Sequence, residues 1–172
     1  MKKLSTILLA VLILSMFCAC AVQEEPVPSE TPEPIDYDSL WDAIATVDGY
    51  DPMVDVPVAY VPQYYEGLKN ADVLGGFMKV AALVSKADEV VVIQLGSAEQ
   101  AQNLAQGAIA KRLEYKRQEW SMYLPEQLAN VEDAIVEVRG DHLIFIVHEN
   151  AEDILYTIDQ FIAPTPEPTA TA

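Results

Sequence analysis

Residues 89–100 read Glu-Val-Val-Val-Ile-Gln-Leu-Gly-Ser-Ala-Glu-Gln. The continuous apolar run at 90–93 is typical of a central strand that is covered on both faces. Ser97, followed three residues later by Gln100, forms the capping-box pattern with which many helices begin. This stretch therefore predicts a buried strand that leads directly into a long amphipathic helix, and the apolar spacing carries that helix to about Tyr123.

The segments around this stretch predict two antiparallel hairpins. Residues 77–84 read as the strand that precedes 89–95, and the four residues between them are the connection. Residues 135–139 and 142–148 alternate around Gly140-Asp141, which is a two-residue turn of the type that begins with glycine.

Helices are expected before, between and after the hairpins. Asp36 is a good N-cap for a helix over 37–47, and Asn150 is a good N-cap for a last helix. Prolines mark the segment 48–68, which we expect to be irregular with room for one short helix at 62–69. The order predicts an α+β fold, in which an antiparallel sheet of about four strands (two hairpins) packs with about three helices.

The overall charge excludes one class of partner. The 172 residues include 27 acidic and 10 basic side chains, which gives a formal net charge of −17. Nucleic-acid binding depends on Lys and Arg neutralising phosphates, so no nucleic-acid partner is expected. Anionic membrane surfaces should repel the chain for the same reason, so charge would not hold it at a membrane.

The first twenty residues predict export. Lys2 and Lys3 precede the apolar run 7–14, which is too short to span a bilayer and has the length of a signal-peptide core. Phe17-Cys18-Ala19-Cys20 resembles the lipobox of bacterial lipoproteins, and the resemblance implies that Cys20 is acylated and becomes the first mature residue. Ala19-Cys20-Ala21 also fits the small-x-small pattern for release as a soluble protein.

Cysteine use favours the lipid anchor, because a single unpaired cysteine is unusual in a secreted chain and acylation removes its thiol. We expect a lipid-anchored protein on the extracytoplasmic side of the cell membrane, attached through its N-terminal lipid. The expected parts are a signal peptide (1–19), the lipidated cysteine with a Pro/Glu-rich stalk (20–35), one domain (36–162) and a disordered Pro/Thr tail (163–172).

The stretch from Lys86 to Glu149 resembles a family of uncharacterised lipoproteins from Gram-positive bacteria that share a domain of unknown function (number 4358 in its naming series). The resemblance rests on Asp88 to Ile93, Arg112-Leu113-Glu114, Trp120 to Gln127 and Val136 to Gly140. It implies location and kinship of fold, and it implies no activity.

No catalytic or metal-binding motif is expected, and no cofactor. His142 and His148 are six residues apart on one strand, which is too far for one metal ion, so we expect two strand-end histidines near solvent. Asp48, Asp51 and Asp55 lack the spacing of a calcium loop and are expected to be solvated.

Two further charged motifs have simple explanations. Arg139-Gly140-Asp141 spells an integrin-type tripeptide that turn chemistry already explains. A basic group could attract an anionic partner, but we expect it to be a solvated helix face. Its members are Lys111, Arg112, Lys116 and Arg117.

The best binding candidates are Tyr60, Tyr64 and Tyr65, which crowd the proline-marked segment and could stack on sugar rings or bind peptide. The alternative is that these rings pack the loop against the sheet. We therefore expect a non-catalytic binding or accessory module at the cell surface with an unknown protein or glycan partner. A carboxylate-dependent glycan hydrolase of the envelope and an envelope structural or assembly factor remain the alternatives.

Overall fold

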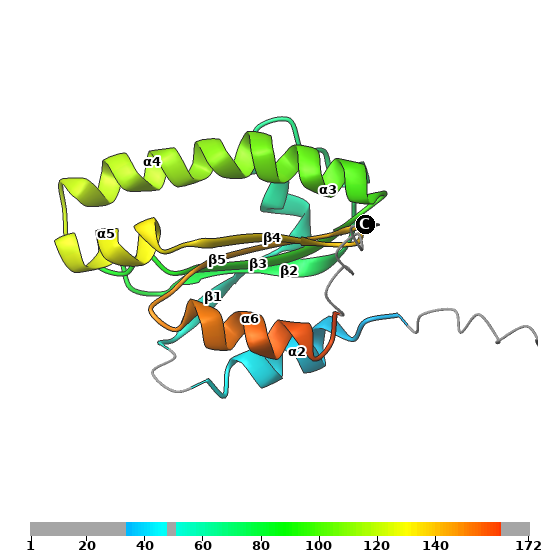
Figure 1. The fold of residues 1–172 in the computed structure, drawn as a ribbon, viewed down its shortest axis with the longest axis horizontal. Coiled ribbons are helices and arrows are strands. Elements are labelled where there is room, and N and C mark those ends of the chain that lie inside the picture. The colour runs from blue at the N-terminus through cyan, green and yellow to red at the C-terminus, as the bar shows by residue number, and fades with distance from the viewer. Residues whose placement is uncertain (1–33, 48–50, 163–172) are drawn as a thin grey trace, which may run out of the picture. The chain divides into compact units, whose positions relative to one another are not determined.

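A computed structural model describes residues 34–47 and 51–162 (Figure 1). The predicted signal peptide, Cys20, most of the stalk, the C-terminal tail and Asp48 lie outside these residues. No helix in the described part of the chain is long and apolar enough to cross a membrane.

The centre of the fold is a five-stranded antiparallel sheet in the order β1-β2-β3-β5-β4. Its strands are β1 (Met53–Val56), β2 (Val73–Ala81), β3 (Glu89–Leu95), β4 (Ile135–Arg139) and β5 (His142–Val147). The two central strands, β3 and β5, are apolar on both faces because helices cover both sides of the sheet.

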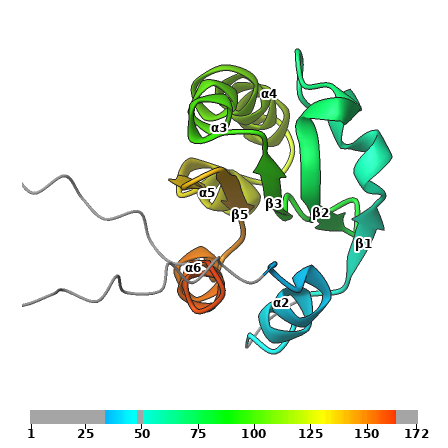
Figure 2. The ribbon, with the colours of Figure 1, turned by 90° about the vertical axis from the view of Figure 1, so that its right-hand side faces the viewer.

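Helices form a layer on each face of the sheet (Figure 2). One layer contains α3 (Ala98–Leu104), a π-helical turn η4 (Ala105–Ile109), α4 (Ala110–Ser121) and α5 (Pro125–Glu132). The 3₁₀ turns η2 (Val58–Gln63) and η3 (Asn70–Asp72) connect β1 to β2. The other layer contains α2 (Tyr37–Ile44) and α6 (Ala151–Asp159).

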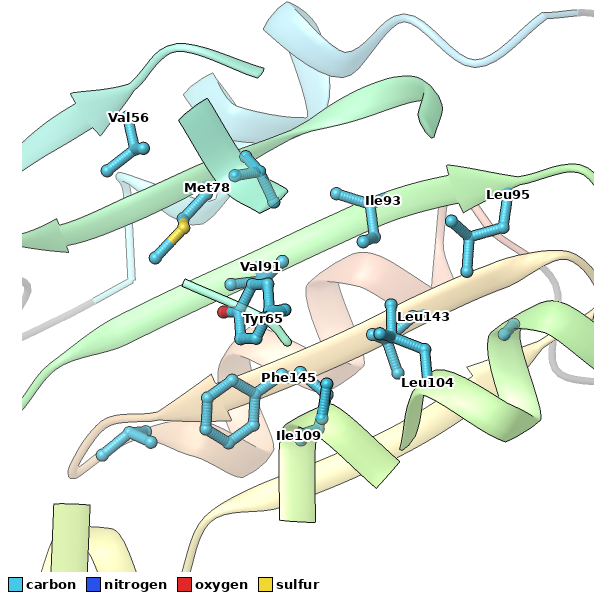
Figure 3. Close-up of a cluster of buried hydrophobic side chains, with 14 of the residues drawn as sticks. Val56, Tyr65, Met78, Val91, Ile93, Leu95, Leu104, Ile109, Leu143 and Phe145 are labelled. Carbon is cyan, nitrogen blue, oxygen red and sulfur yellow. The ribbon is translucent and has the colours of Figure 1, made fainter. Parts of the chain in front are cut away.

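Alternate residues of the central strands supply two separate cores. Val91 and Phe145 face α4 and pack with Tyr65 (Figure 3). Val90 and Ile146 face the other way and pack with α2 and α6. The period-2 alternation of strand side chains therefore divides one apolar run between two helix layers.

The predicted α+β class, the antiparallel sheet and the two hairpins are confirmed. The helix starts are also confirmed: Asp36 accepts hydrogen bonds from the Asp38 and Ser39 amides, and Ser97 accepts one from the Gln100 amide. Asn150 holds the N-cap position of α6, although its side chain makes no capping hydrogen bond.

The sequence prediction missed one strand and one helix. β1 lies between Pro52 and Pro57 at the edge of the sheet, where a strand pairs on one side only and tolerates neighbouring prolines. Pro125 is the first residue of α5, a position that needs no amide hydrogen, so it begins a helix. The short helix expected at 62–69 is instead the 3₁₀ turn η2 at 58–63.

Candidate functional site

The most unusual feature of the fold is a carboxylate buried among three donors. Glu89 is the first residue of β3, and its side chain is fully buried on the face of the sheet that α4 covers. Arg112 Nη2 and Lys116 Nζ lie 2.7 Å and 2.9 Å from Glu89 Oε2. The Tyr65 hydroxyl donates to Glu89 Oε1 at 2.7 Å. We call these four residues the Glu89 cluster.

Three elements hold the Glu89 cluster in place. Arg112 and Lys116 are four residues apart on α4, so their side chains lie on one face of the helix. Lys116 Nζ also donates to the Ala87 carbonyl at 2.7 Å, and the Ala87 amide donates to Gln127 Oε1 of α5 at 2.8 Å. The turn before β3 is therefore tied to both helices.

The neighbours of Glu89 favour its ionised form. Burial by itself raises the pKa of the Glu89 carboxyl, but Lys116, Arg112 and the Tyr65 hydroxyl outweigh burial and hold that pKa below its ordinary value. Burial, followed by the Glu89 carboxylate, raises the pKa of Tyr65 well above its ordinary value, so the hydroxyl stays a donor. Two cations thus share one buried carboxylate.

This arrangement corrects the prediction that the basic residues form a solvated helix face. The Lys116 and Arg112 side chains are only 7% and 20% exposed, and both point at Glu89. Lys111 and Arg117 lie on the exposed side of α4, as expected.

A surface pocket of about 390 Å³ lies directly outside Arg112, and we call it the Arg112 pocket. It is lined by Gln63, Tyr64, Glu66, Ala108, Lys111, Arg112 and Tyr115. The guanidinium carbon of Arg112 lies 5.6 Å from the centroid of the Tyr64 ring, a cation–π distance, while 40% of Tyr64 remains exposed. The pocket therefore presents a cation and aromatic rings to solvent.

A second pocket of about 280 Å³ adjoins the first and shares Glu66 and Ala108 with it. Leu68, Leu95 and Leu104 contribute apolar surface to this pocket. Its remaining lining residues are Gly67, Asp72, Gln100, Asn103 and Gly107. The two pockets lie side by side and are lined mainly by segment 63–72 and the helical stretch 100–115; we call them together the groove.

The π-helical turn η4 forms part of the groove wall. Its residue Ala108 lines both pockets, and its residue Gly107 lines the smaller one. A Cβ atom at Gly107 would meet no atom within 4 Å, so this wall is open. π-helical turns occur frequently at functional sites, which makes the groove the leading candidate site.

The three candidate tyrosines lie in different environments. Tyr64 lines the Arg112 pocket, and Tyr60 is 54% exposed on η2. Tyr65 is fully buried, and its ring packs in the core that Figure 3 shows. We therefore keep Tyr60 and Tyr64 as candidate binding residues and reassign Tyr65 to the core.

A second polar cluster lies on the opposite face of the sheet. The Tyr37 hydroxyl lies 2.9 Å from His142 Nε2, and His142 Nδ1 lies 2.8 Å from Asp141 Oδ1. Gln94 Nε2 donates to Asp141 Oδ2 at 2.9 Å. We call these four residues the His142 cluster.

The prediction that both histidines lie near solvent is wrong, because His142 and His148 are both buried. Burial lowers the pKa of His142, although Asp141 opposes the shift. Burial and, less strongly, Asp141 raise the pKa of Tyr37 to about 12. The arrangement fits a neutral imidazole that donates to Asp141 and accepts from Tyr37. The His148 Nδ1 atom accepts from the Asn150 amide at 3.0 Å.

The other charged motifs are occupied by partners within the chain. Arg139 binds Glu137 and Asp159, and Asp141 belongs to the His142 cluster, so the Arg-Gly-Asp tripeptide is held internally. Asp51 and Asp55 form ion pairs with Lys86 and Lys79, respectively. Among residues 34–47 and 51–162, no group of three or more His, Cys, Asp or Glu side chains could hold a metal ion.

Comparison with known proteins places the chain in a family. The family described as "Domain of unknown function (DUF4358)" matches residues 45–148, which is more than half of the chain. The match takes in all five strands, the Glu89 cluster and segment 63–72, and it excludes α2 and α6. No curated protein and no solved structure matches the chain. The chain therefore belongs to the DUF4358 family.

Proposed function

We propose that the chain is a lipid-anchored extracytoplasmic protein whose domain binds a glycan or protein partner without catalysis. The lipid is attached at Cys20, and the groove between segment 63–72 and stretch 100–115 is the binding surface. The observation that carries the proposal is the Arg112 pocket, where Tyr64 remains exposed beside a fixed cation. Exposed aromatic rings on a rigid scaffold are typical of binding surfaces.

The carboxylates of the groove favour binding over glycan hydrolysis. A hydrolase needs two carboxyl groups that face each other across the scissile bond. Glu66 is instead paired with Lys111 at 2.9 Å and is largely exposed. Asp72 accepts a hydrogen bond from the Lys69 amide at 3.0 Å. Both acids thus already have local partners on the rim of the groove.

Capture from intact cells tests the binding surface. Tyr64→Ala should reduce the amount of partner that is crosslinked to the protein, because it removes the aromatic rim of the Arg112 pocket. Tyr156→Ala is the matched control, since Tyr156 is exposed on α6 at the other face of the sheet and should leave capture unchanged. Equal capture by wild type and Tyr64→Ala would refute the groove as the binding surface. Cleavage of isolated envelope glycan by the protein would favour the hydrolase.

The anchor has its own test. Cys20→Ser should abolish lipid labelling and release the protein to the medium, because the thiol that would carry the acyl chain is absent. Ser15→Ala, which changes the leader but keeps Cys20, should remain in the membrane fraction. Membrane retention of the Cys20→Ser variant would contradict acylation at this position.

A further inference from the structure

The guanidinium group of Arg112 uses only one of its edges inside the protein. Its Nε lies 3.2 Å and 3.3 Å from the two Glu89 oxygens, and its Nη2 lies 2.7 Å from Oε2. In the described residues these are the hydrogen bonds of Arg112, and none of them uses Nη1. No buried side-chain N or O atom of the described residues lacks a partner, so Nη1 reaches the surface.

The free edge of Arg112 can take a second acceptor. Guanidinium carries five N–H donors in a planar fork, so the Nη1–Nη2 edge can hold a carboxylate while the Nε–Nη2 edge holds Glu89. Arg112 is also a lining residue of the Arg112 pocket, where Lys111 adds another cation. Glu66 offsets Lys111 at 2.9 Å, while Arg112 and Lys116 share the single carboxylate of Glu89.

The cation is also held in place before any ligand arrives. Glu89 fixes one edge of the guanidinium, whose central carbon lies over the Tyr64 ring at 5.6 Å from its centroid. A ligand therefore would not have to order a free arginine side chain, which is a cost that otherwise weakens binding.

We propose that the Arg112 pocket binds the carboxylate of a sugar acid, with Arg112 as the anion-recognising residue and Tyr64 and Tyr115 as surfaces for the sugar ring. This proposal names the ligand class of the binding module proposed above and rests on it. Tyrosine rings suit sugar faces, and the Gln63 amide can donate to and accept from hydroxyl groups. No aliphatic side chain larger than that of Ala108 lines the Arg112 pocket, and the three leucines of the groove line the smaller pocket beside it. A peptide with an apolar side chain would therefore favour the smaller pocket over this one.

The test measures binding of defined probes to the full-length protein in detergent by calorimetry. The probes are a uronic-acid tetrasaccharide, its methyl ester, and tetra-alanine with a free carboxyl terminus. Wild type should bind the acid at least about tenfold more tightly than the ester, because esterification removes the charged acceptor. Raising the salt concentration should weaken binding of the acid.

Two variants separate recognition from folding. Arg112→Lys keeps a cation beside Glu89 but lacks the second donor edge, so it should lose at least about tenfold in affinity for the acid. Arg117→Lys makes the same change on α4 outside the pocket and should bind like wild type. The ester comparison uses wild type alone, so it decides the question even if Arg112→Lys folds poorly.

Three outcomes would overturn the inference. They are equal binding of acid and ester, unchanged affinity of a folded Arg112→Lys variant, and tighter binding of tetra-alanine than of the sugar acid. If no sugar acid binds while Tyr64-dependent capture from cells persists, the inference fails and the proposed function stands. If the sugar acid binds through Arg112 but Tyr64→Ala leaves capture unchanged, the sugar-acid site stands and the partner captured from cells binds at another surface.

Discussion

The two buried polar clusters both supply hydrogen-bond partners to a polar side chain of a central strand, but they differ in how donors and acceptors are balanced. In each, a tyrosine hydroxyl binds a side chain of a central strand, at Glu89 of β3 or at His142 of β5. The His142 cluster alternates donors and acceptors, so its members satisfy one another. The Glu89 cluster directs three donors at one carboxylate and leaves donor capacity on Arg112 at the surface. Of the two, the Glu89 cluster is therefore the one with donor capacity left for a ligand, as proposed above.

The largest loss of stability should come from removing the charge at the centre of the Glu89 cluster. Glu89→Gln leaves Arg112 and Lys116 without their anion, and breaking a buried ion pair typically costs about 3–5 kcal/mol. We expect urea unfolding to show a loss of that size. Asp141→Asn is the counterpart in the His142 cluster and should cost clearly less, because Asp141 is partly exposed. Equal losses in the two variants would remove the contrast between the clusters.

Removing the two tyrosine hydroxyls should lower the free energy of unfolding by smaller amounts, which can be compared directly. Tyr65→Phe removes a donor from a fully buried carboxylate and should cost about 1.5–3 kcal/mol. Tyr37→Phe removes a partly buried hydrogen bond between uncharged groups and should cost about 0.5–1.5 kcal/mol. Chemical unfolding of both variants measures the difference. A larger loss for Tyr37→Phe would show that the His142 cluster is the more strongly coupled one.

The smallest effect is a change in the pH dependence of stability. The pKa of His142 is lowered from 6.5 in the folded protein, so the unfolded chain binds more protons between the lowered pKa and 6.5. The free energy of unfolding should therefore rise with pH across that window, and His142→Gln should flatten the rise. Unfolding series between about pH 5 and about pH 7.5 measure it. If His142→Gln kept the full wild-type slope of unfolding free energy against pH, another group would be responsible for the pH dependence.

Local patterns were sufficient to predict most of the sheet but not the direction of charged side chains. The apolar run at 90–93, the turn at Gly140-Asp141 and the cap at Ser97 each act within a few residues. Whether Arg112 points to solvent or into the core depends on Glu89, which lies 23 residues earlier. Helical spacing cannot supply that information, because a solvated basic stripe and a buried one have the same pattern.

A signal for the Glu89 cluster was nevertheless present in the sequence. Glu89 lies in register with Val91 and Ile93, so period-2 alternation places it on a core face. Lys116 similarly falls between Leu113 and Trp120 on the apolar stripe of the long helix. A buried acid needs a buried base as its partner, and this requirement predicts a pair between Glu89 and Lys116. The edge strand β1 and the helix α5 gave weaker signals, because prolines at their ends were interpreted as interruptions.

The π-helical turn determines in which direction the side chains of α4 point. A π turn accommodates one residue more than an α turn, so residues 105–109 act as a single-residue insertion in an otherwise continuous helix. Deleting that residue would rotate α4 by about 100° relative to α3. Arg112 and Lys116 would then turn away from Glu89 while Ser97 still capped the helix. One extra residue in the middle of the helix therefore decides whether these two side chains meet the Glu89 carboxylate or solvent.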